Sequence, residues 1–171
     1  MRLAFSILAV LGLAAVWWYA ASLMPGLPDQ IPAHFGASGA PDRWTDKSAL
    51  WLLPQIDVGV TALMLALGWL TSALARRVPG LVNLPEKEAF VRLPEDARGR
   101  VVAPLGAAFA FFALAEQGLF AWLLRATSEV ALGHAKALDA APLPIFMIAG
   151  VVGLLAGTFA TRRAIARETA G

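Results

Sequence analysis

The residues best suited to chemistry gather in one segment near the start of the chain, residues 27–47. This segment holds a histidine, His34, close to the carboxylates of Asp29, Asp42 and Asp46. Imidazole and carboxylate groups can bind a metal ion, transfer a proton or hold a polar ligand. The prolines and glycines between them exclude a long helix. We therefore expect a structured loop with a binding role, and not a passive connector.

The candidate binding set within this loop combines aromatic, imidazole and charged side chains that stand close together in the sequence. Its members are His34, Phe35, Asp42, Trp44 and Lys47. Such a mixture of residue types predicts recognition of a ligand by the loop.

His34 is also the candidate metal ligand, with Asp42 or Asp46 as oxygen donors and His134 as a further ligand from a later loop. Zinc sites need three or four ligands, usually at a recognisable spacing, and no H-E-x-x-H pattern is present. A histidine in this setting more often hydrogen-bonds within its own loop. We expect no cofactor, with a divalent metal as the alternative. We also expect no catalytic residue, because a Ser38–His34–Asp42 triad would lack an oxyanion hole.

Four long apolar segments must position this loop. The chain is 58% hydrophobic and 15% charged, whereas soluble domains carry about 25% charged residues. A spanning helix needs roughly 20 apolar residues, and the segments that suit this length cover residues 3–21, 49–75, 101–124 and 144–161. The sequence therefore predicts an all-α integral membrane protein. It would be a four-helix antiparallel transmembrane bundle, forming a single membrane domain over residues 1–171.

Basic residues set the expected orientation. The N-terminus with segments 76–100 and 162–171 contains ten Lys and Arg residues, whereas segments 22–48 and 125–143 contain four. Cytoplasmic loops carry an excess of Lys and Arg. We therefore expect both termini in the cytoplasm and the loops 22–48 and 125–143 outside, in a bacterial inner (plasma) membrane. The basic residues flank apolar spans and form no stripe, which argues against a nucleic-acid partner.

Small residues recur along one face of the third and fourth apolar segments, and such faces let membrane helices approach closely. They are Gly106, Ala110 and Ala113 in the third segment, and Ala149, Gly153 and Gly157 in the fourth. We expect them to pack helices within one chain, with a homo-oligomer as the alternative.

Two acids lie inside the predicted spans, Asp57 and Glu116. Each is about eight residues from the outer end of its span, so both lie roughly 12 Å deep. A carboxylate at mid-membrane costs about 2.5–3.5 kcal/mol, so such residues usually face the bundle interior. We expect the two to face each other, either as a hydrogen-bonded pair that joins two helices or as an outward-opening polar pocket. Both therefore belong to the candidate binding set.

The loop motif Ile31-Pro32-x-His34-Phe35, followed by Gly39, Asp42 and Lys47, strongly resembles the membrane domain known as DUF1648. That domain is found in proteins of the SdpI-type toxin-immunity family, where the motif directly follows a first transmembrane helix. Residues 83–90 and 93–98 resemble a second stretch of the same family, so the likeness covers about residues 1–100. The resemblance implies an immunity or sensing role, in which the loop binds an extracytoplasmic peptide or toxin.

The residues themselves leave two other functions open. Asp57 and Glu116 would suit a small proton- or cation-linked transporter, although inverted repeats and broken helices are missing. His34 would suit a metal-dependent membrane-embedded module. The expected partners are membrane lipid and an extracellular peptide or toxin.

Cysteine labelling tests the orientation, because the chain contains no cysteine of its own. Single cysteines at Ser38 and Ala137 are expected to react with a membrane-impermeant thiol reagent on intact spheroplasts. A cysteine at Glu88 is expected to stay unlabelled until the membrane is opened. Labelling at Glu88 alone would overturn the orientation.

Overall fold

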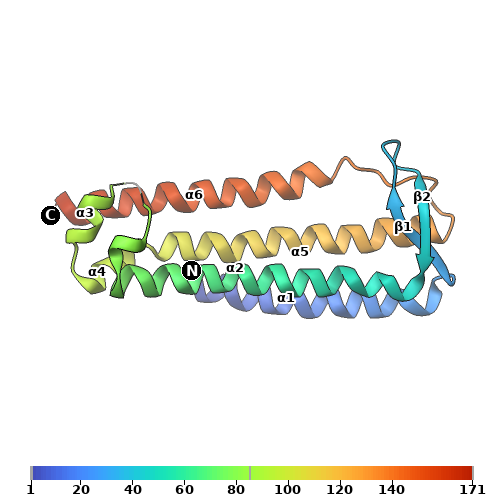
Figure 1. Ribbon diagram of the computed structural model, residues 1–171, viewed down its shortest axis with the longest axis horizontal. Helices are drawn as coiled ribbons and strands as arrows, with labels where there is room; N and C mark the ends of the chain where they lie inside the picture. Colours follow the sequence, from blue (N-terminus) through green and yellow to red (C-terminus); the bar gives the residue numbers. More distant parts are fainter. Residues whose placement is uncertain (1, 85, 171) are drawn as a thin grey trace.

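Four long helices run side by side along the molecule (Figure 1). The structure is a computed structural model that describes residues 2–84 and 86–170. Met1, Pro85 and Gly171, which belong to the predicted N-terminus, cytoplasmic loop and tail, lie outside the described residues. The long helices are α1 (Arg2–Leu23), α2 (Leu52–Arg77), α5 (Ala103–Ala131) and α6 (Leu143–Ala170). All four are long and apolar enough to cross a membrane, which confirms the four predicted spans by length and composition.

α5 and α6 run furthest past the predicted apolar segments. α5 continues to Ala131 instead of ending at residue 124, and α6 continues to Ala170 instead of ending at residue 161. An apolar run marks only the part of a helix that can lie in hydrocarbon. Backbone hydrogen bonds carry the helix further, through charged residues. Most of the predicted tail, residues 162–170, is therefore helical.

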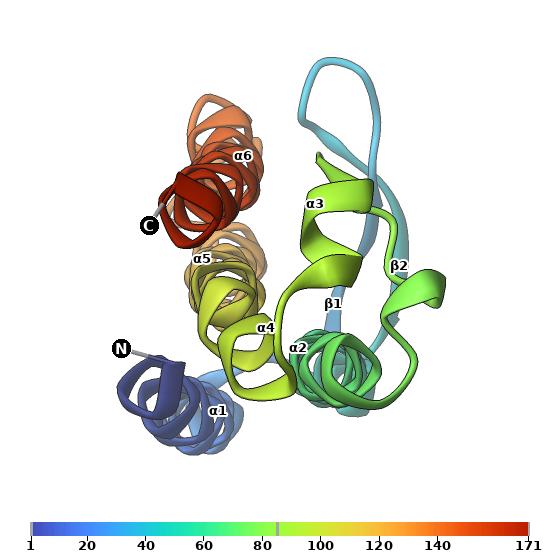
Figure 2. The same ribbon diagram turned by 90° about the vertical axis from the view of Figure 1, so that its left-hand side faces the viewer.

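α5 is the helix against which the others pack. It contacts α1, α2 and α6, and α6 makes its main contact with α5. Figure 2 shows α5 between α6 on one side and the pair α1 and α2 on the other. The close approach depends on small residues: a Cβ on Gly68 of α2 would lie 3.2 Å from the Gly106 carbonyl oxygen, and Gly157 of α6 faces Ala108. The predicted small-residue faces therefore do pack helices together within the chain.

The segment between α2 and α5 forms a small folded cap at one end of the helices, here called the α3–α4 end. It contains a short 3-10 turn (η3, Pro79–Leu81), α3 (Lys87–Arg92) and α4 (Glu95–Val101). Phe90 of α3 is fully buried in an apolar cluster that also includes Ile165 of α6. The cap therefore holds the ends of α2, α5 and α6 together.

The loop at the opposite end, the hairpin end, contains a β-hairpin. β1 (Gln30–Phe35) and β2 (Pro41–Asp46) pair antiparallel in a two-stranded sheet. Two 3-10 turns, η1 (Met24–Gly26) and η2 (Lys47–Trp51), join the hairpin to α1 and α2. The loop that the sequence predicts to be structured therefore contains two β-strands, within a mostly helical fold.

The local sequence explains the hairpin. Once prolines and glycines exclude a helix, the isoleucine, phenylalanine, tryptophan and threonine side chains favour strands. Gly39, at φ 78°, makes the turn, and the Gly36 N–H donates to the Ala40 carbonyl oxygen at 2.9 Å. An isolated hairpin is marginally stable, and here β1 packs against α5.

The α5–α6 contact can be tested with a single methyl group. Gly157→Ala is expected to lower the free energy of unfolding by about 1–3 kcal/mol, because overpacking forces neighbours to move. The added Cβ would meet Ala108 and the carbonyl oxygen of Pro104. Unfolding in mixed detergent–SDS micelles, followed by circular dichroism, measures the change.

Gly59→Ala is the matched control, since nothing lies within 4 Å of a Cβ at this position of α2. It should leave stability unchanged or raise it by about 0.5–1 kcal/mol through helix propensity. Equal losses in both variants would contradict a close contact at Gly157.

Candidate functional site

The hairpin is fixed at its base by Lys47. Its Nζ lies 3.2 Å from Oδ1 of Asp29, and its backbone N–H donates to the Asp29 carbonyl oxygen at 2.9 Å. Beside it, Asp46 accepts a hydrogen bond from the Ser48 N–H at 2.8 Å and so caps the turn that leads into α2. The pKa of Asp46 lies below its usual value because Ser48 stabilises the carboxylate, mainly through its side chain and less through its backbone N–H. These contacts set where the hairpin lies above α2.

The pairing of the strands brings His34 and Asp42 together. Nδ1 of His34 lies 2.7 Å from Oδ1 of Asp42, and both side chains are more than half exposed, at 56% and 53%. Nε2 is then the ring nitrogen left for a ligand. His134 pairs instead with Glu129, its Nδ1 lying 3.3 Å from Oε2 of that residue. Within residues 2–84 and 86–170, no three His, Cys, Asp or Glu side chains gather as a metal site. Metal binding by His34 stays a prediction.

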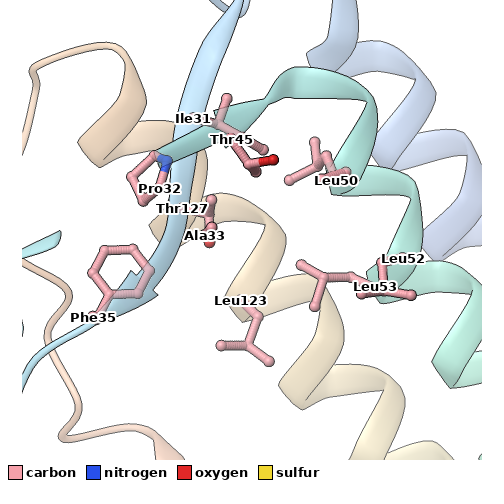
Figure 3. A pocket seen from close by; sticks show the side chains of 11 residues that line it. Ile31, Pro32, Ala33, Phe35, Thr45, Leu50, Leu52, Leu53, Leu123 and Thr127 are labelled. Carbon is pink, nitrogen blue, oxygen red and sulfur yellow. The ribbon is translucent and has the colours of Figure 1, made fainter. Parts of the chain in front are cut away.

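An apolar cavity of about 370 Å³ separates β1 from the ends of α2 and α5 that lie next to the hairpin (Figure 3). Its walls come from three elements: Ile31 and Phe35 of β1, Leu50 and Leu53 around the start of α2, and Leu123 and Thr127 of α5. The volume is in the range of small-ligand pockets. Of these residues, only Phe35 belongs to the predicted binding set. The leucines were missed because nothing distinguishes them from other apolar residues of a span.

A second hollow, of about 530 Å³, lies on the other side of Phe35, between the hairpin tip and the segment that leads into α6. Ala33, Phe35 and Leu123 line both cavities. A backbone hydrogen bond from the Leu138 N–H to the Gly39 carbonyl oxygen, at 2.8 Å, ties the two connecting segments together. Phe35 therefore stands in the wall between two adjoining hollows.

Trp44 lies apart from both cavities. It lies opposite Pro32 in the strand pairing and is 48% exposed. Its role in binding stays a prediction.

Deeper along the helices, a polar layer joins α1, α2 and α5. Thr61 Oγ1 donates to Asp57 Oδ1 at 3.3 Å. Gln117 Nε2 donates to Thr61 Oγ1 at 3.0 Å and to the Ala9 carbonyl oxygen at 2.7 Å. Asp57, Thr61 and Gln117 are all at most 3% exposed. The amide of Gln117 fits against α1 because Gly12 has no side chain there.

Glu116 lies on the face of α5 that meets α2. Phe109, two turns earlier on α5, contacts Gly68 of α2, and residues seven apart share a helix face. Gln117, the next residue, belongs to the polar layer, so Glu116 lies at the same depth as Asp57. Both acids thus belong to the α2–α5 interface at one depth. A shared proton, water or cation between them stays a prediction.

The cavity and the polar layer are stacked one above the other. Leu53, which lines the cavity, precedes Asp57 by one turn of α2, and neither Asp57 nor Glu116 lines the cavity. The site is therefore an apolar pocket above a buried acidic layer. The two sequence-based alternatives for the acids, a hydrogen-bonded pair and an outward-opening polar pocket, both stay predictions.

The fold and site define a helical multi-pass membrane protein with a β-hairpin across one end of its helices. Residues 11–56 match the family described as "Domain of unknown function (DUF1648)". The matched segment contains most of α1, the whole hairpin and the start of α2. An uncharacterized protein of Archaeoglobus fulgidus is 35% identical over 78 residues, which are 46% of this chain and 43% of that protein. No solved structure matches the chain.

The polar layer gives a stability test at Thr61. Thr61→Val keeps the shape of the side chain but removes the hydroxyl between Asp57 and Gln117. Hydrogen bonds inside membrane proteins average about 0.6 kcal/mol and reach about 1.7 kcal/mol, so a loss of about 1 kcal/mol is expected. Unfolding in mixed micelles measures it.

Thr158→Val on α6 is the control, because among the described residues that hydroxyl bonds only to the Leu154 carbonyl oxygen of its own helix. It should change stability by much less. A Thr61→Val protein as stable as the wild type would show that the layer does not hold the helices together.

Proposed function

We propose that this protein binds an exported apolar peptide at the outer surface of a bacterial plasma membrane and so serves in immunity or sensing. The observation that carries the proposal is the apolar cavity between β1 and the ends of α2 and α5. An aliphatic or aromatic side chain of a peptide would fill a space of this size and composition. The basic residues around the α3–α4 end support the orientation that puts the hairpin outside.

The hairpin favours a peptide over other apolar ligands. In the described residues the sheet consists of β1 and β2 alone, so each strand has an edge without a strand partner. A bound peptide can add a strand to such an edge, with alternate side chains entering a pocket. Phe35 would contact the ligand, while His34, Asp42 and Lys47 would hold the hairpin in position. The resemblance to SdpI-type immunity proteins agrees with this function.

A second candidate is a proton- or cation-linked function, and the buried acids favour it. Oδ2 of Asp57, Oε2 of Glu116 and Oε1 of Gln117 are buried without a hydrogen-bond partner among the described residues. All three atoms are acceptors, and a proton or cation would satisfy them.

The first function is tested in cells whose survival of secreted apolar peptides depends on this gene. Leu123→Trp fills the cavity, and the double change His34→Ala and Asp42→Ala frees the hairpin. Each is expected to weaken peptide binding at least about tenfold, which corresponds to about 1.4 kcal/mol, and so to lower survival. Leu155→Trp is the matched control, because Leu155 lies on α6 at 65% exposure.

Membrane abundance, measured by immunoblotting, must be equal across the variants. Full protection by both site variants would contradict the assignment of the cavity and the hairpin. Replacement of Asp57 and Glu116 together by leucine separates the two functions, whereas single amide replacements should be mild. If the double leucine variant loses protection while Leu123→Trp protects normally, the cation-linked function is favoured.

A further inference from the structure

A second site lies at the α3–α4 end, far from the hairpin. A cavity of about 390 Å³ opens between the first turn of α1, the last turns of α2 and the start of α4. Figure 2 looks onto this end and shows α4 between α1 and α2. Its lining includes Arg2, Trp69, Ser72, Arg76, Arg77 and Glu95.

The lining carries an excess of positive charge. It includes three arginines and one acid, Glu95. Within the described part of the chain, none of the three arginines lies in a salt bridge, whereas Arg100 and Arg162 at the same end are both paired with carboxylates. The cavity therefore concentrates guanidinium groups whose charge the protein leaves unbalanced.

Neutral groups lie against two of these guanidinium groups. Arg2 Nη1 donates to Ser72 Oγ at 2.7 Å, and Ser72 Oγ in turn donates to the Gly68 carbonyl oxygen at 3.0 Å. Arg76 lies over Gly99 of α4, where a Cβ would come 2.6 Å from its Nε. Positioned arginines recognise phosphate oxygens through paired hydrogen bonds.

The surroundings of the cavity suit a lipid. Trp69, in its lining, is 63% exposed, and Leu70 beside it is 44% exposed. Tryptophan is enriched where a membrane helix meets the headgroups. The arginine-rich end is the one expected in the cytoplasm, and that leaflet carries anionic lipids. An arginine cavity with an apolar face at its side matches a phosphate headgroup with its acyl chains.

We propose that the cavity formed by Arg2, Ser72, Arg76 and Arg77 binds the phosphate headgroup of an anionic phospholipid. The arginines contact the phosphate, and Trp69 lies against the glycerol and acyl chains. This site is separate from the hairpin site and does not depend on its function.

Native mass spectrometry of the full chain in mild detergent tests the proposal. The protein is titrated with phosphatidylglycerol, a singly charged anionic lipid, and with zwitterionic phosphatidylcholine of the same acyl chains. Phosphatidylglycerol should bind at least about tenfold more tightly, and Arg76→Gln should remove about tenfold of that affinity, the effect of one charged hydrogen-bonded contact. Phosphatidylcholine also carries a phosphate, but its choline cation opposes the arginines, so its weaker binding should change by less.

Arg163→Gln is the matched control. It removes the same charge at the same end, but Arg163 lies over the ring of Phe159 on α6 and outside the cavity. Its effect should stay below about twofold, as for a screened distant charge. An equal loss in both variants would show diffuse charge attraction and would overturn the site.

The source of the phosphate is tested by competition. Millimolar inorganic phosphate should not displace phosphatidylglycerol, because it lacks acyl chains. Displacement by free phosphate would show a soluble-anion site, and equal binding of both lipids would show no headgroup recognition; either result overturns the proposal. Circular dichroism checks that each variant is folded. If Arg76→Gln does not fold, Arg77→Gln replaces it with the same expected loss.

Discussion

Close contact between α5 and its neighbours is the constraint on which the rest of the structure depends. Lipid tails are as apolar as leucine, so helices in a membrane associate through tight packing and hydrogen bonds. α5 supplies both. Gly106 and Ala108 let α2 and α6 come near, and Gln117 hydrogen-bonds to α1 and α2. The residues that carry this contact are small or polar.

The hairpin site follows from that contact. A two-stranded sheet is marginal by itself, so β1 needs the surface that α5 provides. Lys47 and Asp29 close the other side of the hairpin, next to the start of α2. The cavity exists because the hairpin reaches from α5 to α2 without filling the space between them. The shape of the cavity therefore depends on β1, α2 and α5 together.

The sequence predicts the spans well because a long apolar run has few alternatives to a membrane helix. It identifies Asp57 and Glu116 because a carboxylate in such a run is costly. It does not identify Thr61, since a threonine costs little there and its role appears only when Gln117 reaches it from another helix. Within the loop, residue types predict an ordered segment. The contact of His34 with Asp42 also needs the strand pairing, in which His34 lies opposite Arg43 and the register shifts on either side of it.

The residues that line the cavity could not be predicted from the sequence for a similar reason. Leu50 and Leu123 come from helices far apart in the chain, and each looks like any other leucine in a span. Only the three-dimensional arrangement distinguishes a leucine that faces an open space from one that faces lipid. The same holds for Arg76, whose position over Gly99 depends on how α4 returns to α2.

The hydrogen bond between Leu138 and Gly39 gives the molecule a mechanical property. It joins the hairpin tip to the segment that leads into α6, and α6 is one unbroken helix of 28 residues, a rod about 42 Å long. At its far end, Arg162 pairs with Glu86 next to α3. A movement of the hairpin tip must therefore either break the hydrogen bond between Leu138 and Gly39 or displace α6, which is attached to the α3–α4 end through Arg162 and Glu86.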